Sequence, residues 1–394
     1  MAGSMDLSGT LSTPLHEEEA AWLRELLAQL GQQAAEARFD VAPNPCVGAA
    51  ILSDGVEIGR AIHERWGGLH AEPRALAAAE GSGVPRERWD TIVITLEPCS
   101  SIGKTGSCVD AILASGLRRV VVGGLDPDPR HRGRGLELLS EAGLEVIHLR
   151  GGSYLEDVSP HFLRWTRPER IRRRRPWTIA KWAQTRTGQL TPPENVGEGR
   201  WISGAASLDR VQVLRGRVDA IVTGIGTVLR DDPRLTVRTP GNTEARPLRV
   251  VLDTELRMSP DARLFAPAEA HEGAGEVHVF TRPGGDGARR RALEAAGAIL
   301  HAVRPGDDGR LSLREVSGVL WELGVRRTLL EAGPTMIESF YAAELIDQVA
   351  ITTGNVNGGR GPSLAAHLQL DRLEGIRRQE VGEDQWLEAF LKSR

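Results

Sequence analysis

Short apolar runs typical of β-strands alternate with amphipathic, helix-like segments along almost the whole chain. This alternation predicts an α/β fold, in which helices cover the faces of a sheet. The expected strands are 47–52, 56–62, 91–96, 118–123, 145–148, 177–183, 220–223, 248–252, 276–280, 327–330 and 348–352. The expected helices are 16–37, 70–80, 109–115, 136–142, 205–215, 289–296, 312–323 and 335–343. Asp54-Gly55 predicts a tight turn between the first two strands.

A basic segment interrupts the alternation at residues 164–175, which read Arg-Trp-Thr-Arg-Pro-Glu-Arg-Ile-Arg-Arg-Arg-Arg. The chain of 394 residues is also longer than an average domain and suits two. We therefore expect a first domain over residues 15–163, a linker over 164–176 and a second domain over 177–394. Residues 1–14, which contain Gly, Ser, Thr and Pro, are expected to form a loose tail without chemistry.

The near balance of charge argues against a general attraction to nucleic acid or to anionic membranes. The chain has 49 basic and 53 acidic residues and a formal net charge of −4. We therefore expect a small-molecule substrate, with no nucleic-acid and no membrane partner. Three cysteines do not make a disulfide framework, and the amino terminus lacks the pattern of a signal peptide. Since no apolar run is long enough to span a bilayer either, these features favour the cytoplasm.

Residues 70–108 carry the pattern with the clearest chemistry. His70 opens an expected helix, Cys99 follows a strand and Cys108 lies beside another helix start, so the three side chains could meet at one edge of the sheet. They would give a zinc ion three protein ligands and leave a fourth position for water, as in catalytic zinc sites. Glu72 would then carry the proton. Zinc-dependent nucleobase deaminases combine the same residue types, although here eight residues rather than two separate the cysteines.

The residues alone leave two alternatives open. If Cys46 supplied a fourth ligand, the site would be closed and structural. If the basic segment bound single strands, the protein would be a nucleic-acid-editing deaminase with salt-dependent binding, and the second domain would have no purpose. The spacing also raises a geometric question, because residues two apart on a regular helix point about 200° away from each other. We therefore expect His70 and Glu72 to flank the metal at a frayed first turn.

Further motifs extend along both halves of the chain. Those of the first half are Pro43-Asn44-Pro45, His63-x-Arg65-x-Gly67, His70-Ala71-Glu72, Leu96-Glu97-Pro98-Cys99, Gly103-Lys104-Thr105, Asp126-Pro127 and Gly133-Arg134-Gly135. Those of the second half are Lys181, Trp201-Ile202, Gly226-Thr227-Val228, Asp231-Asp232-Pro233, Leu235-Thr236-Val237-Arg238 and Glu331-Ala332-Gly333-Pro334-Thr335. In this order, and over nearly the whole chain, they resemble the bifunctional riboflavin-biosynthesis deaminase/reductase family. The spacing of the cysteines is also that of the family.

The resemblance implies a cytidine-deaminase-like amino-terminal domain and a dihydrofolate-reductase-like carboxy-terminal domain. The first would deaminate 2,5-diamino-6-ribosylamino-4(3H)-pyrimidinone 5′-phosphate hydrolytically, with zinc on His70, Cys99 and Cys108. Glu72 would shuttle protons. The second domain would use NADPH to reduce the ribosyl group of the product to ribityl. The resemblance also favours a homodimer that forms through the reductase domains.

The resemblance further assigns contacts to individual residues. The implied substrate contacts of the deaminase are Asn44, His63, Lys104 and Asp126. The implied NADPH contacts are Ala183, Trp201, Thr227, Asp231 and Gly333, and the implied substrate contacts of the reductase are Arg215, Leu235, Arg238 and Glu331. A glycine-flanked turn at 224–226, and Gly333 at a helix start, would let backbone amides approach phosphate. Arg215 and Arg238 could each hold a phosphate by a two-pronged hydrogen bond.

The chain departs from the family pattern at several positions. These are Ser101, Ile102, Gly106, Ser107, Asp128, Thr185-Arg186-Thr187 and Gly199. The alternative function is therefore that of a diverged enzyme, in which one half is inactive or accepts a related pyrimidine.

Overall fold

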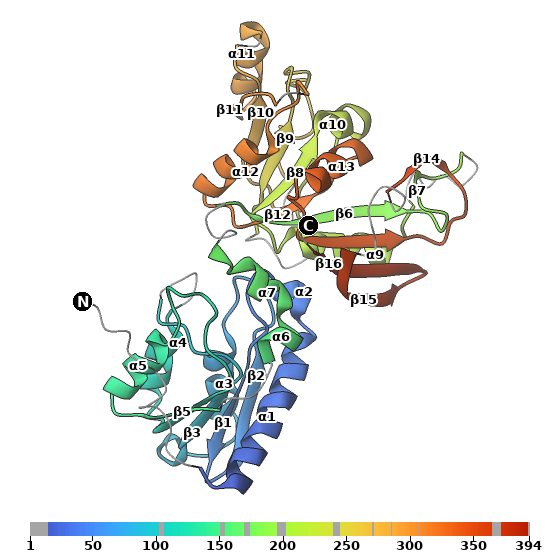
Figure 1. Ribbon diagram of the computed structural model, residues 1–394. Coiled ribbons are helices and arrows are strands. Elements are labelled where there is room, and N and C mark those ends of the chain that lie inside the picture. Colours follow the sequence, from blue (N-terminus) through green and yellow to red (C-terminus); the bar gives the residue numbers. More distant parts are fainter. Residues whose placement is uncertain are drawn as a thin grey trace. The chain divides into compact units, whose positions relative to one another are not determined.

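The computed structural model describes residues 15–101, 106–149, 154–168, 174–194, 202–238, 245–269, 272–284, 286–306, 308–364 and 372–392. The chain forms two compact units, Met1–Arg172 and Arg173–Arg394, and the division falls within the basic segment. Lys104 and Trp201, two of the expected site residues, lie outside the described residues, as do Ile102, Gly199 and the expected tail. Each unit is a sheet with helices packed on it, which confirms the predicted α/β fold (Figure 1).

The first unit is built on a five-stranded sheet with the order β2-β1-β3-β4-β5. Its strands are β1 (Gly48–Ser53), β2 (Val56–Ile62), β3 (Thr91–Ile94), β4 (Arg119–Val122) and β5 (Glu145–His148). β1 runs antiparallel to β2 and β3, whereas β3, β4 and β5 are parallel. The predicted tight turn is confirmed, because Asp54 and Gly55 have positive φ angles of 51° and 76°, as a type I′ turn requires.

Helices cover both faces of this sheet (Figure 1). They are α1 (Glu17–Ala35), α2 (Arg38–Val41), α3 (Ala71–Glu80), α4 (Cys108–Ala114), α5 (Arg134–Glu141), α6 (Tyr154–Val158) and α7 (Pro160–Trp165), with a 3₁₀ turn η1 (Arg86–Arg88). On one face, apolar residues of α1 such as Leu27 pack with Ala50 and Leu52. On the other face, Ala49 and Ile51 pack with α3, α4 and α5. Successive residues of β1 therefore belong to two different cores.

The second unit is built on a nine-stranded sheet with the order β11-β10-β9-β8-β12-β6-β13-β16-β15. These strands are β6 (Trp177–Gln184), β8 (Ala220–Gly224), β9 (Leu248–Leu252), β10 (Val277–Thr281), β11 (Ala298–Ala302), β12 (Arg327–Leu330), β13 (Gln348–Thr353), β15 (Leu373–Val381) and β16 (Asp384–Leu391). From β11 to β13 in this order neighbouring strands are parallel, and β16 pairs antiparallel with β13 and β15. A separate pair joins β7 (Gln189–Thr191) to β14 (Arg360–Ser363). The helices are α9 (Ala205–Arg215), α10 (Ile225–Asp231), α11 (Gly287–Ala295), α12 (Leu313–Glu322) and α13 (Pro334–Ala342).

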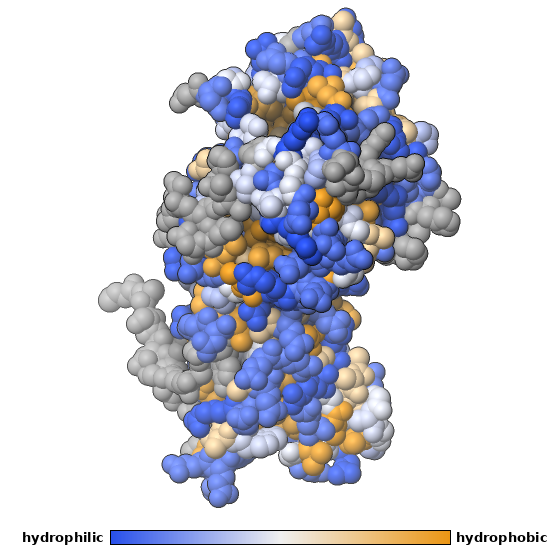
Figure 2. All heavy atoms as spheres, turned by 90° about the vertical axis from the view of Figure 1, so that its right-hand side faces the viewer, coloured by the Kyte–Doolittle hydropathy of each residue, from blue (hydrophilic) through white to orange (hydrophobic). Residues whose placement is uncertain are grey.

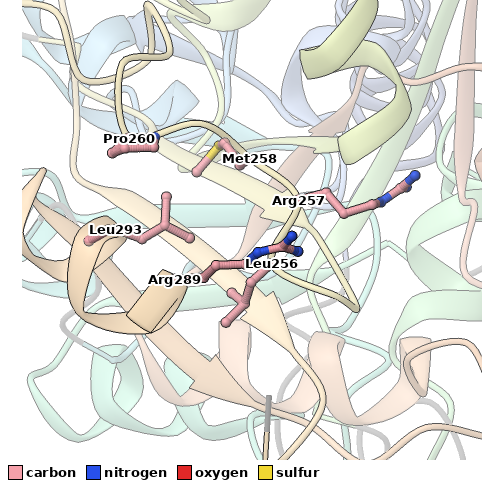
Figure 3. Close-up of a pocket in the computed structure, with 7 residues that line it drawn as sticks. Leu256, Arg257, Met258, Pro260, Arg289 and Leu293 are labelled. Carbon is pink, nitrogen blue, oxygen red and sulfur yellow. The ribbon is translucent and has the colours of Figure 1, made fainter. Parts of the chain in front are cut away.

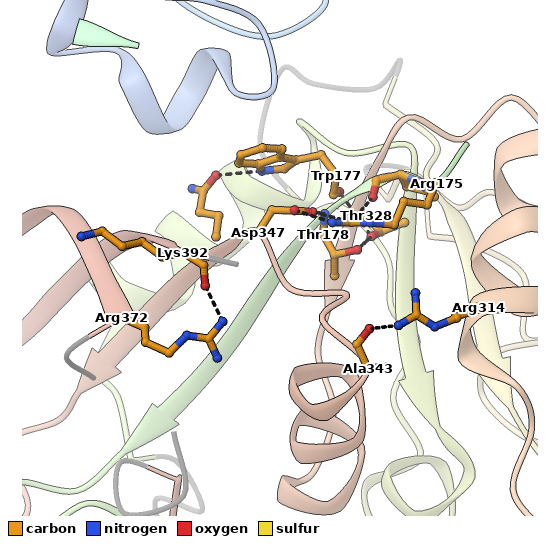
Figure 4. A network of polar contacts seen from close by, with 11 residues as sticks. Arg175, Trp177, Thr178, Arg314, Thr328, Ala343, Asp347, Arg372 and Lys392 are labelled. Atoms are coloured by element: carbon orange, nitrogen blue, oxygen red, sulfur yellow. Dashed lines mark hydrogen bonds and ion pairs between the residues drawn. The ribbon is translucent and has the colours of Figure 1, made fainter. Parts of the chain in front are cut away.

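A buried ion pair holds the start of the second unit to the loop before β13 (Figure 4). Nη1 and Nη2 of Arg175 each donate to one carboxylate oxygen of Asp347 at 2.7 Å, and both side chains are 5% exposed. The same carboxylate accepts a hydrogen bond from the backbone N–H of Thr178 at 2.9 Å. Arg175, at the end of the basic segment, is therefore fixed in the second unit.

Several elements differ from the expectation. The prediction of a glycine-flanked turn at 224–226 is wrong, because Gly224 ends β8 and the helix α10 begins at the next residue. The hairpin of β15 and β16, the strand β11, the pair β7–β14 and the short helices α6 and α7 were not predicted. In β15, charged residues such as Arg377, Arg378 and Glu380 hide the alternation typical of a strand. This is because β15 lies at an edge of the sheet and is largely exposed.

Apolar side chains lie mostly inside the two units. The face of the molecule shown in Figure 2 is largely hydrophilic, and hydrophobic residues come to its surface in separate patches. Within the described ranges, no helix combines the length and the apolar character that a membrane span needs.

Candidate active sites

Three elements of the first unit bring His70, Cys99 and Cys108 together. His70 is the residue before α3 and has an extended backbone, with φ −68° and ψ 170°. Cys99 lies in the loop after β3, and Cys108 is the first residue of α4. Ser107 caps this helix, since its Oγ accepts a hydrogen bond from the backbone N–H of Asp110 at 3.3 Å. One strand end and two helix starts therefore meet at the site.

The three ligand-type atoms form a tight cluster. Nδ1 of His70 lies 3.6 Å from Sγ of Cys99 and 3.3 Å from Sγ of Cys108. All three atoms lie within 4.8 Å of one another, and no other group of His, Cys, Asp and Glu side chains in the described part of the chain is arranged in this way. Two sulfurs and one imidazole nitrogen are a donor set of catalytic zinc sites, so the residues present fit a zinc ion.

The two thiols of the cluster compete for one proton. The hydrogen bond from Cys108 lowers the pKa of Cys99 to about 4, whereas the same hydrogen bond and burial raise the pKa of Cys108. The pKa of His70 is raised, mainly by its hydrogen bond with Cys99. Cys99 is therefore the more readily ionised thiol of the pair, and a metal ion would bind both sulfurs in their thiolate form.

Glu72 lies in the first turn of α3. Its side chain is buried, at 3% exposure, and its Oε2 has no hydrogen-bond partner among the described residues. Burial raises the pKa of this carboxyl group, and the positive charge of His70 opposes the shift. The carboxyl group also contacts the side chain of Cys108. Because His70 precedes the helix as its N-cap residue, an ordered helix start takes the place of the expected frayed turn.

Cys46, considered above as a fourth ligand, does not belong to the cluster. It packs with Ala34, Ala37 and Val41 in a separate apolar group, and burial raises the pKa of its thiol to about 11. Its backbone N–H donates to Oγ of Ser159 at 2.8 Å. This placement argues against a closed site with four protein ligands.

Asn44 and His63 form a hydrogen-bonded pair next to His70. Nδ1 of His63 donates to the carbonyl oxygen of Leu69 at 3.0 Å, and its Nε2 accepts from Nδ2 of Asn44 at 3.2 Å. The rings of His63 and His70 meet edge to face, with centroids 5.1 Å apart. Burial lowers the pKa of His63 to about 4, which keeps its ring neutral. From α7, Nε2 of His161 donates to the carbonyl oxygen of Asn44 at 2.9 Å and fixes this loop.

Asp126 lies in a small pocket beside Cys99. The pocket, of about 60 Å³, is lined by Glu97, Pro98, Cys99, Ser100, Ser101, Asp126 and His131. The nearby Asp128, a departure from the family pattern, pairs with Arg130 at 2.5 Å, and these hydrogen bonds lower the pKa of Asp128. The charge of Arg130 therefore offsets the negative charge of Asp128. His131 was not predicted as a site residue, because a single histidine in a Pro- and Arg-rich stretch forms no pattern.

In the second unit, the carboxyl ends of the neighbouring parallel strands β8, β12 and β6 lie at one edge of the sheet. Ala183 lies near the end of β6, Thr227 in the first turn of the helix after β8, and Gly333 caps the helix after β12. Asp231 ends α10 and pairs with Arg230 at 2.9 Å on the surface. The described NADPH contacts implied by the resemblance therefore lie either near the end of β6 or on the helices that follow β8 and β12.

Arg215 and Glu331 form a largely buried ion pair in the same unit. Nε and Nη2 of Arg215 donate to the two carboxylate oxygens of Glu331 at 2.7 Å, and the side chains are 11% and 15% exposed. Nε and Nη2 of Arg215 are thus engaged by Glu331, whereas a phosphate was expected to accept their hydrogen bonds. Although burial favours the neutral acid, Arg215 and Lys181 keep the pKa of Glu331 low.

Lys181 belongs to the motifs of the second half, but it was not predicted as a site residue. It lies in β6, and burial lowers the pKa of its amine, while the charge of Glu331 opposes this shift. The signal in the sequence was a lysine within a mostly apolar strand, Trp177–Gln184. A lysine in such a strand must find a counter-charge, and Glu331 supplies it.

Leu235 and Arg238 lie on a turn near the same ion pair. Leu235 is buried and has a positive φ of 52°, which is uncommon for a residue with a side chain. The backbone N–H of Arg238 donates to Oε1 of Gln212 at 3.0 Å, so this turn is held to α9. Burial and the charge of Arg215 lower the pKa of Arg238. Two guanidinium groups therefore lie near each other in this part of the unit.

A larger pocket, of about 270 Å³, lies beyond the end of β9 (Figure 3). It is lined by Leu256, Arg257, Met258, Pro260, Arg289, Ala292 and Leu293. Figure 3 shows that Arg289 extends from α11 toward Leu256. This pocket was not predicted, because its lining comes from two separate segments. Apolar side chains and two arginines suit a ligand that has both an apolar and an anionic part.

Each of the two units matches a known protein family. Residues 20–124 match the cytidine and deoxycytidylate deaminase zinc-binding region, and residues 176–386 match the RibD C-terminal domain. The fold, the site and these matches define a two-domain enzyme that joins a zinc-type deaminase to a reductase.

The relatives narrow this class further. The RibD proteins of Aquifex aeolicus and Escherichia coli are both 32% identical to this chain, over 322 and 340 residues. The first match covers 82% of this chain and 84% of the relative, and the second covers 82% and 85%. The chain belongs to the RibD family of riboflavin biosynthesis proteins, and it is a bifunctional deaminase/reductase.

Solved structures of the family have the same fold. Acinetobacter baumannii RibD is 26% identical, with a TM-score of 0.65, and the match covers 95% of this chain and 100% of that one. A diaminohydroxyphosphoribosylaminopyrimidine deaminase/5-amino-6-(5-phosphoribosylamino)uracil reductase from Thermotoga maritima is also 26% identical, with a TM-score of 0.63 and the same coverage.

Proposed function

We propose that this enzyme carries out two consecutive steps of riboflavin synthesis. The first unit removes an amino group hydrolytically from 2,5-diamino-6-ribosylamino-4(3H)-pyrimidinone 5′-phosphate. The second reduces the ribosyl group of the product to ribityl with hydride from NADPH. The observation that carries the proposal is the cluster of His70, Cys99 and Cys108 beside the buried carboxyl group of Glu72. The Thermotoga maritima protein of similar fold is a deaminase and reductase of this kind.

Nδ1 of His70 and the sulfurs of Cys99 and Cys108 would hold the zinc ion. Bound zinc lowers the pKa of a water molecule to about 7 and so supplies a nucleophile at neutral pH. Oε2 of Glu72 accepts a proton from the attacking water and passes it to the amino group, which leaves as ammonia. The position of Glu72 supports this role, because its buried carboxyl group contacts the side chain of Cys108 and its Oε2 has no hydrogen-bond partner among the described residues.

Asn44, His63, Lys104 and Asp126 would hold the substrate of the deaminase. His63 accepts the hydrogen bond from Nδ2 of Asn44, so the amide oxygen of Asn44 is left to accept one from the pyrimidine. Asp126 lines the pocket beside Cys99, and Lys104 would add a positive charge for the phosphate.

NADPH would bind at the edge formed by the strand ends of the second unit. Its contacts would be Ala183, Trp201, Thr227, Asp231 and Gly333. The pocket beyond β9 supports an extension of this site, since its two arginines, Arg257 and Arg289, could bind the phosphate at the adenosine end.

The ribosyl substrate would lie near the ion pair of the second unit. Its contacts would be Arg215, Leu235, Arg238 and Glu331. Because Glu331 already forms an ion pair with Arg215, Arg238 would bind the phosphate of the substrate. Arg215 would then orient Glu331.

We assign the deaminase to residues 15–163 and the reductase to residues 177–394, joined by residues 164–176. The thiols of Cys99 and Cys108 must stay reduced to bind a metal ion, which supports a cytoplasmic location. A homodimer through the reductase domains is proposed from the family resemblance, and the mass of the protein in solution would test it.

Separate assays of the two steps test these proposals. The purified protein should release ammonia from the diaminopyrimidine phosphate without NADPH, and it should oxidise NADPH only when the deaminated product is present. Inactivity of both halves on these compounds would contradict the proposal. Activity of one half alone would identify the diverged alternative.

A further inference from the structure

One carboxylate connects two segments that border the pocket beside Cys99. Glu97 lies two residues before Cys99 and is 6% exposed. Its Oε2 accepts hydrogen bonds from the backbone N–H groups of Asp126 at 3.1 Å and Gly133 at 2.8 Å. Its Oε1 accepts one from Gly135 at 3.0 Å. One side chain therefore binds three backbone amides that lie 29 to 38 residues further along the chain.

Two of these amides belong to the start of α5. Gly133 is the N-cap residue of this helix, with a positive φ of 84°, and it has no side chain that could cap the helix. The first N–H groups of a helix have no partner within it, and the helix dipole favours a negative charge there. Glu97 therefore supplies the missing cap from a distant segment.

The two segments are also packed backbone against backbone. A Cβ atom on Gly135 would lie 2.2 Å from the carbonyl oxygen of Pro98, so only glycine permits this approach. Pro98 stands between Glu97 and Cys99. The first turn of α5 is thus pressed against the peptide that carries Cys99.

The segment held by Glu97 forms part of the pocket. Glu97 binds the two ends of the segment 126–135, and Asp126 and His131 of this segment both line the pocket with Cys99. Asp126 is fixed further, because its Oδ1 accepts a hydrogen bond from the backbone N–H of Asp128 at 2.8 Å.

We propose that Glu97 is a positioning residue of the deaminase: it holds Asp126 and His131 beside Cys99, and His131 contacts the substrate. We call these two residues the substrate wall. The inference rests on the proposed deaminase activity. Glu97 itself does not touch the substrate. Loss of its hydrogen bonds should therefore weaken substrate binding more than the chemical step, which depends on Glu72 and the ligand cluster.

Glu97→Gln tests this role, because glutamine keeps the shape of the side chain but turns an amide NH₂ toward backbone donors. The KM of deamination should rise by about tenfold, as the loss of one charge-assisted hydrogen bond implies, with kcat changed by less than about threefold. The zinc content should stay the same.

Asp90→Asn is the matched control. Asp90 precedes β3, at the opposite end of this strand from Cys99, and its Oδ2 also accepts a backbone N–H, from Asp54 at 2.5 Å. This variant should lower the melting temperature without changing the KM of deamination. The reductase rate of each preparation reports whether the second unit is intact.

His131→Ala tests the substrate wall directly, without disturbing the hydrogen bonds of Glu97. Its KM should rise, while the zinc content and melting temperature stay those of the wild type. Combined with Glu97→Gln, the effect should be less than additive, because both changes remove the same contact. An unchanged KM in either single variant would overturn the inference. If the wild type released no ammonia, the proposed function would fail as well, so the two failures are distinguishable.

Discussion

Nδ2 of Asn44 lies 3.2 Å from Nε2 of His63, and this hydrogen bond has a fixed direction. The carbonyl oxygen of Leu69 accepts a hydrogen bond from Nδ1–H of His63, so in the neutral ring Nε2 can only accept. This direction fixes the side-chain amide of Asn44, with Nδ2 toward His63 and Oδ1 away from it. The ring of His63 contacts the ring of His70, so Asn44 is oriented beside the ligand cluster.

We expect Asn44→Asp to reverse this relationship. A carboxylate facing Nε2 favours the imidazolium form, so the pKa of His63, which burial lowers to about 4, should rise. NMR titration of the ring should show no protonation of His63 between pH 5 and 8 in the wild type and clear protonation in the variant. Titration of the wild-type ring near pH 6.5 would contradict the assigned direction.

Glu72→Gln should abolish ammonia release and leave the ligand cluster intact. The amide cannot accept a proton from water, so kcat of deamination should fall by about 10²- to 10⁴-fold. Metal analysis should show the same zinc content as in the wild type, because Glu72 is not part of the ligand cluster. NADPH oxidation with the deaminated product should also be unchanged. Normal deamination by this variant would exclude Glu72 as the proton carrier.

The ligand cluster was predictable because its residue types are scarce and chemically specific. The chain has only three cysteines, and two of them follow the pattern of a zinc deaminase. The expected order of strands and helices also predicted that His70, Cys99 and Cys108 lie at the ends of elements. The same reasoning identified Gly333 as a helix start.

Contacts between a side chain and distant backbone were not predictable. Glu97 belongs to a motif that the sequence analysis noted, but its partners are amides, which every residue has. The hairpin of β15 and β16 was missed for another reason, since its edge strand is mostly charged and exposed. The arginine fork of Arg215 was expected to bind phosphate, because nothing in the sequence showed that Glu331 lies opposite it.

Removal of zinc with a chelator should stop deamination and spare the reductase. It should also expose Cys99, which is partly exposed and has a lowered pKa, to thiol reagents, whereas Cys46 should stay unreactive because it is buried and its pKa is raised to about 11. Thiol titration before and after chelation measures this difference. A reductase rate that falls together with deamination would contradict the assignment of zinc to the first unit.

The stability of the first unit should fall in acid, partly because of His161. Burial lowers the pKa of this ring to about 4, so the unfolded chain binds a proton below about pH 6.5 and the folded chain only near pH 4. Stability should therefore be lost as the pH falls through this range, by roughly 3 kcal/mol from His161 alone. Urea unfolding at several pH values should show a shallower pH dependence for His161→Gln than for the wild type. An equal pH dependence of stability in the wild type and in the variant would contradict the lowered pKa of His161.

Glu331→Gln should destabilise the second unit, because it leaves the guanidinium of Arg215 buried beside Lys181 without a counter-charge. Removing one partner of a buried pair costs about 3–5 kcal/mol, and reductase activity should fall with it. Arg304→Ala is the control: its ion pair with Glu315, at 3.2 Å, is exposed. The control should change the free energy of unfolding by less than about 1 kcal/mol. If both substitutions changed the free energy of unfolding equally, the ion pair of Arg215 and Glu331 would contribute no more to stability than an exposed one.

The most direct test of the two-step account is to identify the products formed by one preparation of the full chain with zinc. The diaminopyrimidine phosphate is supplied first without NADPH and then with it. The account predicts ammonia and 5-amino-6-(5-phosphoribosylamino)uracil in the first stage, and the ribityl compound with one NADPH oxidised per molecule in the second. A zinc-loaded protein that releases no ammonia, and that leaves the ribosyl group unreduced when given the deaminated compound, would contradict it.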